Sequence, residues 1–83
     1  MRAPNERWNE EEAIVLLQDV GTLVVRLEAT GARMPQEERE QCHARLLTAH
    51  DAKDMTAYRN ALEGYAEEAR KAYRKAKGRR RPN

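Results

Sequence analysis

The side chains able to do acid–base, nucleophilic or metal chemistry gather in one short part of the chain. They are Cys42, His43, His50, Asp51 and Asp54. The two histidines are seven residues apart, which would place them on one face of a helix. Structural zinc takes four ligands at recognisable spacings, usually with paired cysteines or a histidine pair on adjacent turns. The pattern therefore predicts no metal site, and we interpret His50 as a helix-end residue favoured by the helix dipole.

A cysteine beside a histidine is also the pair used in nucleophilic catalysis. Such a pair needs contact between the two side chains, a group that orients the histidine and a pocket that stabilises an oxyanion. A thin helical protein of 83 residues offers no such pocket, so we interpret Cys42 as a small core residue. The sequence also lacks a glycine-rich phosphate loop, a nucleophile elbow and an HExxH motif. We therefore expect no enzyme activity, no cofactor and no small-molecule substrate.

A run of cations is the most distinctive chemical feature of the chain. All 14 acidic residues lie at or before Glu68, whereas 8 of the 16 basic residues follow it. On a helix these cations would project on neighbouring ridges, where they could bind the phosphates of a nucleic acid by charge and not by sequence. The alternatives are an acidic protein or a membrane surface as the partner, or a segment that only complements the helix dipole and solubilises the chain. The eight residues are Arg70, Lys71, Arg74, Lys75, Lys77, Arg79, Arg80 and Arg81.

Two capping patterns mark the starts of helices. Asn9 is followed by three glutamates, which predicts a helix start with an N-cap and with acids at the positive end of the dipole. Gly31 predicts the end of this helix, because glycine readily adopts the left-handed conformation. Pro35 is followed by a glutamine and two glutamates, which predicts a second helix over residues 35–49.

A third helix, the longest, is predicted from Met55 until Gly78 ends it, after a tight polar turn at residues 50–54. Short connections favour antiparallel neighbours. The predicted fold class is therefore all-α, a three-helix up-down-up bundle with a long C-terminal helix and a basic tail. The expected divisions are 1–8 as an N-terminal extension, 9–77 as the three-helix domain and 78–83 as the basic C-terminal tail.

The expected core is small because the chain has no Phe and one Trp. A domain of this size buries only about 60% of the surface that its unfolded chain exposes, so an interface would add useful stability. The residues predicted to form the core are Leu16, Val20, Leu23, Leu27, Leu46, Leu62 and Tyr65.

The first helix carries a second apolar line outside this core stripe. It is made of Ile14, Gly21 and Val25, with Gln18 beside them as part of the same predicted interface. A three-helix bundle does not require a helix that is apolar on more than one side, so we predict a protein contact at this strip. A homodimer is the simplest form, because twofold pairing lets one patch cover itself. The alternative is that the strip lies inside the bundle. Trp8 is interpreted as a hydrophobic staple over the first turn, with a partner anchor as its alternative.

Three features bear on location. The single cysteine forms no internal disulfide, no signal-peptide-like apolar run follows the first residues, and the longest apolar stretch is too interrupted to span a membrane. These features predict a cytoplasmic protein. We interpret the chain as a small binding or adaptor protein that acts through a helix face and a basic C-terminal segment. The alternatives are a nucleic-acid-associated accessory protein that binds phosphates through the tail, and a self-assembling structural subunit.

Overall fold

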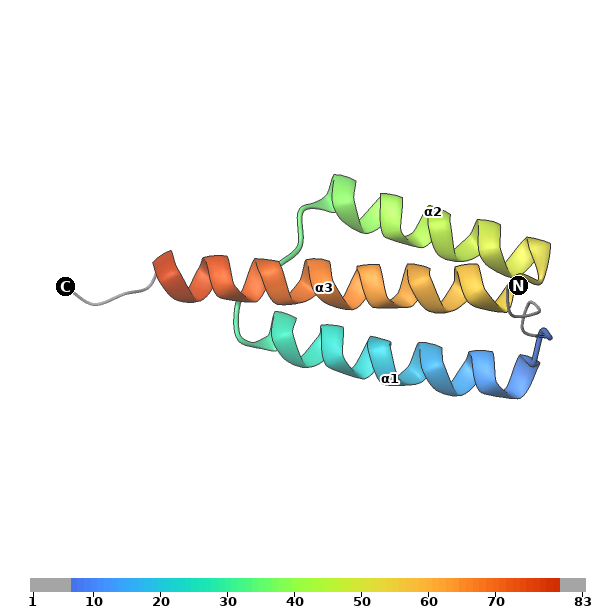
Figure 1. Cartoon of the computed structure of the whole chain (residues 1–83). Helices are drawn as coiled ribbons and strands as arrows, with labels where there is room; N and C mark the ends of the chain where they lie inside the picture. The colour runs from blue at the N-terminus through green and yellow to red at the C-terminus, as the bar shows by residue number, and fades with distance from the viewer. Residues whose placement is uncertain (1–6, 80–83) are drawn as a thin grey trace, which may run out of the picture.

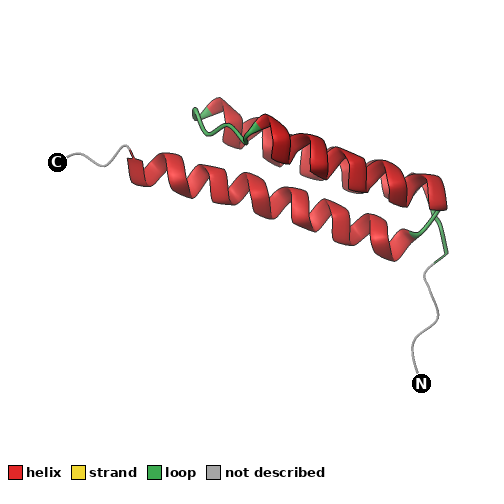
Figure 2. Ribbon diagram, turned by 90° about the horizontal axis from the view of Figure 1, so that it is seen from above, coloured by secondary structure: helices red, strands yellow, loops and turns green. Residues whose placement is uncertain are grey.

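The computed structural model describes residues 7–79, and this part of the chain is three α-helices without a strand. They are α1 (Glu10–Ala29), α2 (Gln36–Ala52) and α3 (Met55–Arg79). In Figure 1, α1 and α2 lie on either side of α3, and Figure 2 shows α3 on one side of the pair that they form. The predicted all-α class is confirmed, and so is the prediction that the third helix is the longest.

The predicted start of the first helix is confirmed. The side chain of Asn9 accepts a hydrogen bond of 3.0 Å from the backbone N–H of Glu12, as an N-cap does. At the other end, α1 stops at Ala29 and Gly31 follows with a φ of +97°, a conformation that side chains rarely adopt. Local capping therefore sets both ends of α1.

The second helix is longer than predicted, and the turn after it is shorter. We expected a helix over 35–49 and a turn over 50–54, but α2 continues to Ala52. Lys53 then takes the left-handed conformation, and the Asp54 carboxylate accepts the Ala57 backbone N–H at 3.1 Å to cap α3. The prediction was wrong because a polar segment can extend a helix when one of its residues is packed: His50, in the last turn of α2, packs against Trp8.

The third helix does not end where predicted. α3 continues through Gly78 to Arg79. A glycine inside a helix costs about 1 kcal/mol relative to alanine, which is too little to stop a helix without a cap of its own. Arg80 and Arg81, which we assigned to the basic tail, lie outside the described residues.

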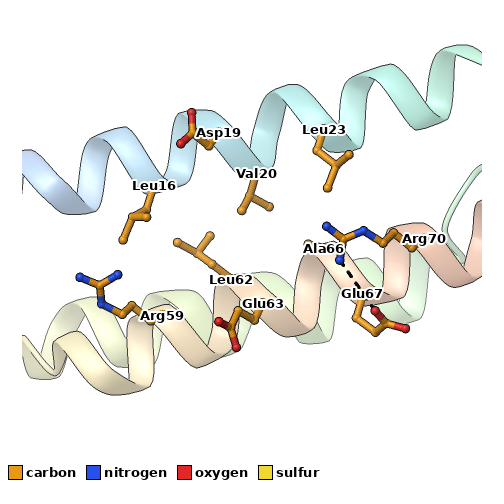
Figure 3. Close-up of a pocket in the computed structure, with 10 residues that line it drawn as sticks. All are labelled: Leu16, Asp19, Val20, Leu23, Arg59, Leu62, Glu63, Ala66, Glu67 and Arg70. Atoms are coloured by element: carbon orange, nitrogen blue, oxygen red, sulfur yellow. Dashed lines mark ion pairs between the residues drawn. The ribbon is translucent and has the colours of Figure 1, made fainter.

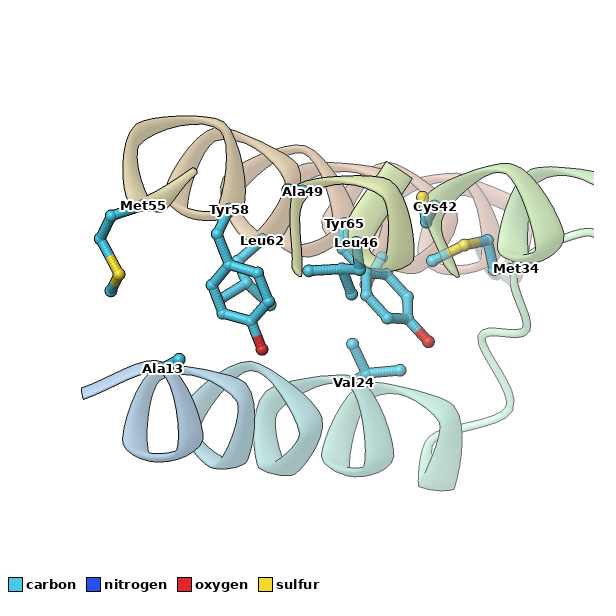
Figure 4. Close-up of a cluster of buried hydrophobic side chains, with 11 residues drawn as sticks. Ala13, Val24, Met34, Cys42, Leu46, Ala49, Met55, Tyr58, Leu62 and Tyr65 are labelled. Atoms are coloured by element: carbon cyan, nitrogen blue, oxygen red, sulfur yellow. The ribbon is translucent and has the colours of Figure 1, made fainter. Parts of the chain in front are cut away.

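The core is built around α3. Both α1 and α2 pack along this helix, whereas within residues 7–79 no close backbone contact joins α1 to α2. Figure 4 shows the buried side chains of α3 between the other two helices. The main buried cluster is Ala13, Val24, Met34, Cys42, Leu46, Ala49, Met55, Tyr58, Leu62, Tyr65 and Ala69.

The predicted core is right for α2 and α3 and too broad for α1. Leu46, Leu62 and Tyr65 are buried as expected. The buried positions of α1 are Ala13 and Val24, while its predicted core residues are only half-buried. These half-buried residues are Leu16, Val20, Leu23 and Leu27. The reason is that α1 is packed along α3 alone, so part of its wide apolar side stays near the surface.

No helix in the described part of the chain combines the length and the apolar character needed to cross a membrane.

We expect the depth of a leucine to set the effect of its truncation. Leu62→Ala should lower the free energy of unfolding by about 2–5 kcal/mol, because it removes buried methyl groups and leaves a cavity. Leu23→Ala should lower it by less, because Leu23 is half-buried. Urea denaturation followed by circular dichroism measures both. Equal losses of unfolding free energy in the two variants would contradict the half-buried position of Leu23.

Candidate interaction surfaces

Polar and aromatic contacts link α1 to α2 at two places. Near one end of α1, the Glu28 carboxylate accepts a hydrogen bond from the Arg39 guanidinium and pairs with its charge. Near the other end, His50 Nε2 lies 3.8 Å from Glu10 Oε2. The Trp8 ring packs there edge-on against the ring of His50, with centroids 5.2 Å apart. These contacts hold α1 and α2 in place where their backbones do not meet.

Trp8 packs onto the protein itself. Besides His50, its ring meets the ring of Tyr58 from α3 edge-on, with centroids 5.3 Å apart. Its indole N–H donates a hydrogen bond of 2.9 Å to the Glu10 carboxylate. The half-buried ring therefore ties the start of α1 to both other helices, a wider role than the staple over one turn that we expected.

An apolar groove runs between α1 and α2. It is lined by Leu17 of α1, by Tyr58 of α3 and by four residues of α2, which are His43, Leu46, Leu47 and His50. Leu17 is 44% exposed and Leu47 is 63% exposed. Two large leucines thus stand at opposite sides of the groove with much of their surface in water.

The predicted strip of α1 borders this groove. Ile14 and Gly21 are three residues before and four residues after Leu17, so they share its side of the helix, and Val25 follows Gly21 by one turn. Ile14 is 48% exposed and Val25 is 66% exposed. Nothing lies within 4 Å of the place where a Cβ on Gly21 would be. The strip is therefore on the surface and not inside the bundle.

We define the α1–α2 face as this strip together with the two exposed leucines of the groove, Leu17 and Leu47. Its residues are Ile14, Leu17, Gln18, Gly21, Val25 and Leu47. Sequence reasoning did not identify Leu47 as part of an exposed surface. The sequence does contain a signal for this. Leu46 and Leu47 are adjacent on a helix and point about 100° apart, so only one of them can face α3.

A second groove lies between α1 and α3. Figure 3 shows leucine and valine side chains of α1 facing Leu62 of α3, with charged side chains around them. On the rim, Arg70 Nη1 lies 3.8 Å from Glu67 Oε1, and the Arg59 guanidinium pairs with Glu12. The apolar residues here are half-buried or buried, and the cations on the rim are paired, so this groove is a less open surface than the α1–α2 face.

The described cations of the basic run lie on the C-terminal part of α3, and Figures 1 and 2 show that the end of this helix extends past the other two. Arg70, Lys71, Arg74, Lys75 and Lys77 are all exposed. Several are paired with α3's own acids: Arg74 lies 3.2 Å from Glu67, and Lys71 lies 3.6 Å from Glu68. The structure describes Arg79 as part of α3, and nothing further of the predicted tail.

Arg33 joins these cations from a different part of the chain. It lies in the connection between α1 and α2, and it lines a notch that also includes Lys71, Arg74 and Lys75. Among the described residues, neither Arg33 nor Lys75 forms an ion pair. Sequence reasoning missed Arg33, because no local pattern shows that this connection meets α3.

The candidate chemical residues do not assemble into one site. His43 Nε2 lies 3.1 Å from the Tyr65 hydroxyl, whereas His50 faces Trp8 and Glu10. Cys42 is buried, and burial raises the pKa of its thiol, which disfavours the reactive thiolate. Within residues 7–79 no three His, Cys, Asp or Glu side chains come together in a way that could hold a metal ion.

Comparison with family models, with curated proteins and with solved structures found no match for this chain. The surfaces themselves are therefore the basis for a functional proposal.

The contact between Trp8 and Glu10 predicts a dependence of stability on acid. The indole hydrogen bond lowers the pKa of the exposed Glu10 carboxyl from its usual value of 4.5. A lowered pKa in the folded state means that the carboxylate stabilises the fold above pH 4.5 and that this contribution is lost as the pH falls through the lowered value. Glu10→Gln should therefore have a lower melting temperature than the parent protein at neutral pH. In acid, the two proteins should have the same melting temperature. An equal difference in melting temperature between the two proteins at neutral pH and in acid would contradict a role for the charged carboxylate.

Proposed function

We propose that this chain is a small binding or adaptor protein that acts through the α1–α2 face and through the basic end of α3. One observation carries the proposal: large apolar side chains with 44% to 66% of their surface exposed gather along a single face. Contiguous exposed apolar surface on a small protein is typical of a protein contact. We further propose an up-down-up order of the helices with a separate basic tail, supported by the two short connections at the ends of the molecule in Figure 1.

A matched pair of valine substitutions tests the α1–α2 face. Val25 belongs to this face, whereas Val15, exposed by 53%, does not. Val25→Glu should weaken the binding of a purified partner at least 10-fold, because a charge would be buried without a counterion. Val15→Glu introduces the same charge on the same helix and should leave affinity unchanged. The partner is found by affinity capture and mass spectrometry and is then measured by calorimetry. Equal affinities of the two variants would contradict the proposal.

The second candidate function is the binding of nucleic-acid phosphates by the basic end of α3. The specific observation is the notch where Arg33 adds a cation to Lys71, Arg74 and Lys75. Cations from the α1–α2 connection and from α3 meet at this notch, which Glu38 and Glu68 also line, and their charge would suit a phosphate backbone. The ion pairs with Glu67 and Glu68 reduce this charge, so the unpaired Arg33 and Lys75 would contribute most.

Salt dependence tests this second candidate. The logarithm of the affinity for duplex DNA should fall linearly with the logarithm of salt concentration, and Arg33→Gln with Lys75→Gln should reduce the slope by about 0.9 for each phosphate that the variant no longer neutralises. Arg45→Gln is the control, because it removes an exposed cation of α2 outside the notch. Fluorescence anisotropy at several salt concentrations measures the slopes. Identical slopes for all three proteins would rule out phosphate binding at the notch.

A further inference from the structure

We propose that the partner of the α1–α2 face is a second copy of this chain, held in a twofold pair in which the two α1 helices cross antiparallel at Gly21. This inference rests on the proposed function of the face and names the partner that covers it. A twofold interface places the same patch on both copies, so the patch must be complementary to itself. The charge, symmetry and size of the face can each be compared with that requirement.

None of the six residues that define the face is charged. On α1 its residues are apolar, a glutamine or a glycine. At one end of the face Glu28 pairs with Arg39, and at the other end Glu10 accepts the Trp8 indole N–H and lies 3.8 Å from His50 Nε2. A neutral face does not attract a charged partner, and it does not repel an identical copy. Charge therefore favours a second copy over an acidic or basic segment.

Two apolar residues of the face, Leu17 and Val25, are placed symmetrically about Gly21. Leu17 lies four residues before Gly21, and Val25 lies four residues after it. When two α1 helices cross antiparallel at this glycine, Leu17 of each copy faces Val25 of the other. Gly21 would face itself, and the absence of a side chain there, with open space around it, lets the two backbones approach closely.

The groove between α1 and α2 provides a place for the incoming side chain. Leu17 and Leu47 line the same groove, one from each helix. At the level of Leu17, the second copy presents Val25, which would enter between these two leucines. The twofold axis repeats this contact, so both grooves are filled at once. The arrangement covers the exposed leucines and both valines at position 25.

The size of the face fits a weak but specific dimer. An α-helix of 20 residues is about 30 Å long and about 10 Å wide. Two such helices side by side present about 600 Å² on each copy, which is at the lower end of specific protein interfaces. We therefore expect dissociation constants in the micromolar range, with exchange between monomer and dimer.

A cysteine at the predicted axis tests the pairing directly. Gly21→Cys should form a disulfide-linked dimer on mild oxidation, because the two backbones must approach to within about 7 Å. Val15→Cys is the control and should stay monomeric, because Val15 does not belong to the face. The native Cys42 is buried in both proteins. Equal crosslinking of the two variants, or none in Gly21→Cys, would overturn the proposed register.

Sedimentation equilibrium tests the dimer without crosslinks. The parent and Val15→Glu should dimerise, and Val25→Glu and Leu47→Glu should each raise the dissociation constant at least 10-fold. Circular dichroism checks that each variant is folded. If Val25→Glu unfolds, the crosslinking result decides whether the proposed dimer forms. A parent that remains monomeric at about 1 mM overturns the proposed second copy. In that case, a purified foreign partner whose binding still depends on Val25 would leave the proposed function of the face intact.

Discussion

Both shorter helices depend on α3 for their packing, and most other features of the structure follow from this dependence. Tyr58, Leu62 and Tyr65 form a buried row along α3 that reaches toward α1 and α2. The other two helices meet each other through side chains, chiefly Glu28 with Arg39 and the contacts of Trp8 and His50. Because α1 and α2 do not close on each other, the core is thin and a groove remains open between them.

The sequence predicts the elements well where the deciding forces are local. Asn9 caps α1 and Gly31 follows its end, since these effects depend on the neighbouring backbone alone. Predictions failed where local patterns were ambiguous. Residues 50–52, which begin with the polar His50 and Asp51, are helical, because His50 packs against Trp8 of another segment. Gly78 remains helical because a glycine weakens a helix without ending it.

The candidate surfaces were predictable in part. The excess of apolar residues on α1 indicated that Ile14 and Val25 lie outside the core, and both are exposed. The opposite wall of the groove was not foreseen, because the position of Leu47 relative to Leu17 depends on how far apart α1 and α2 are held by α3. Arg33 was missed for the same kind of reason: its place beside Lys75 depends on tertiary packing that no sequence period encodes.

The order of the helices along the chain has a consequence for biosynthesis. α1 and α2 are synthesised first, yet neither has a large surface of the other to pack on, and helices in proteins gain most of their stability from such packing. α1 and α2 are therefore stable only when α3 is present, and the domain folds as one cooperative unit after α3 has been synthesised. Until then the apolar side of α1 is uncovered on the nascent chain, and exposed apolar surface of this kind is prone to aggregation.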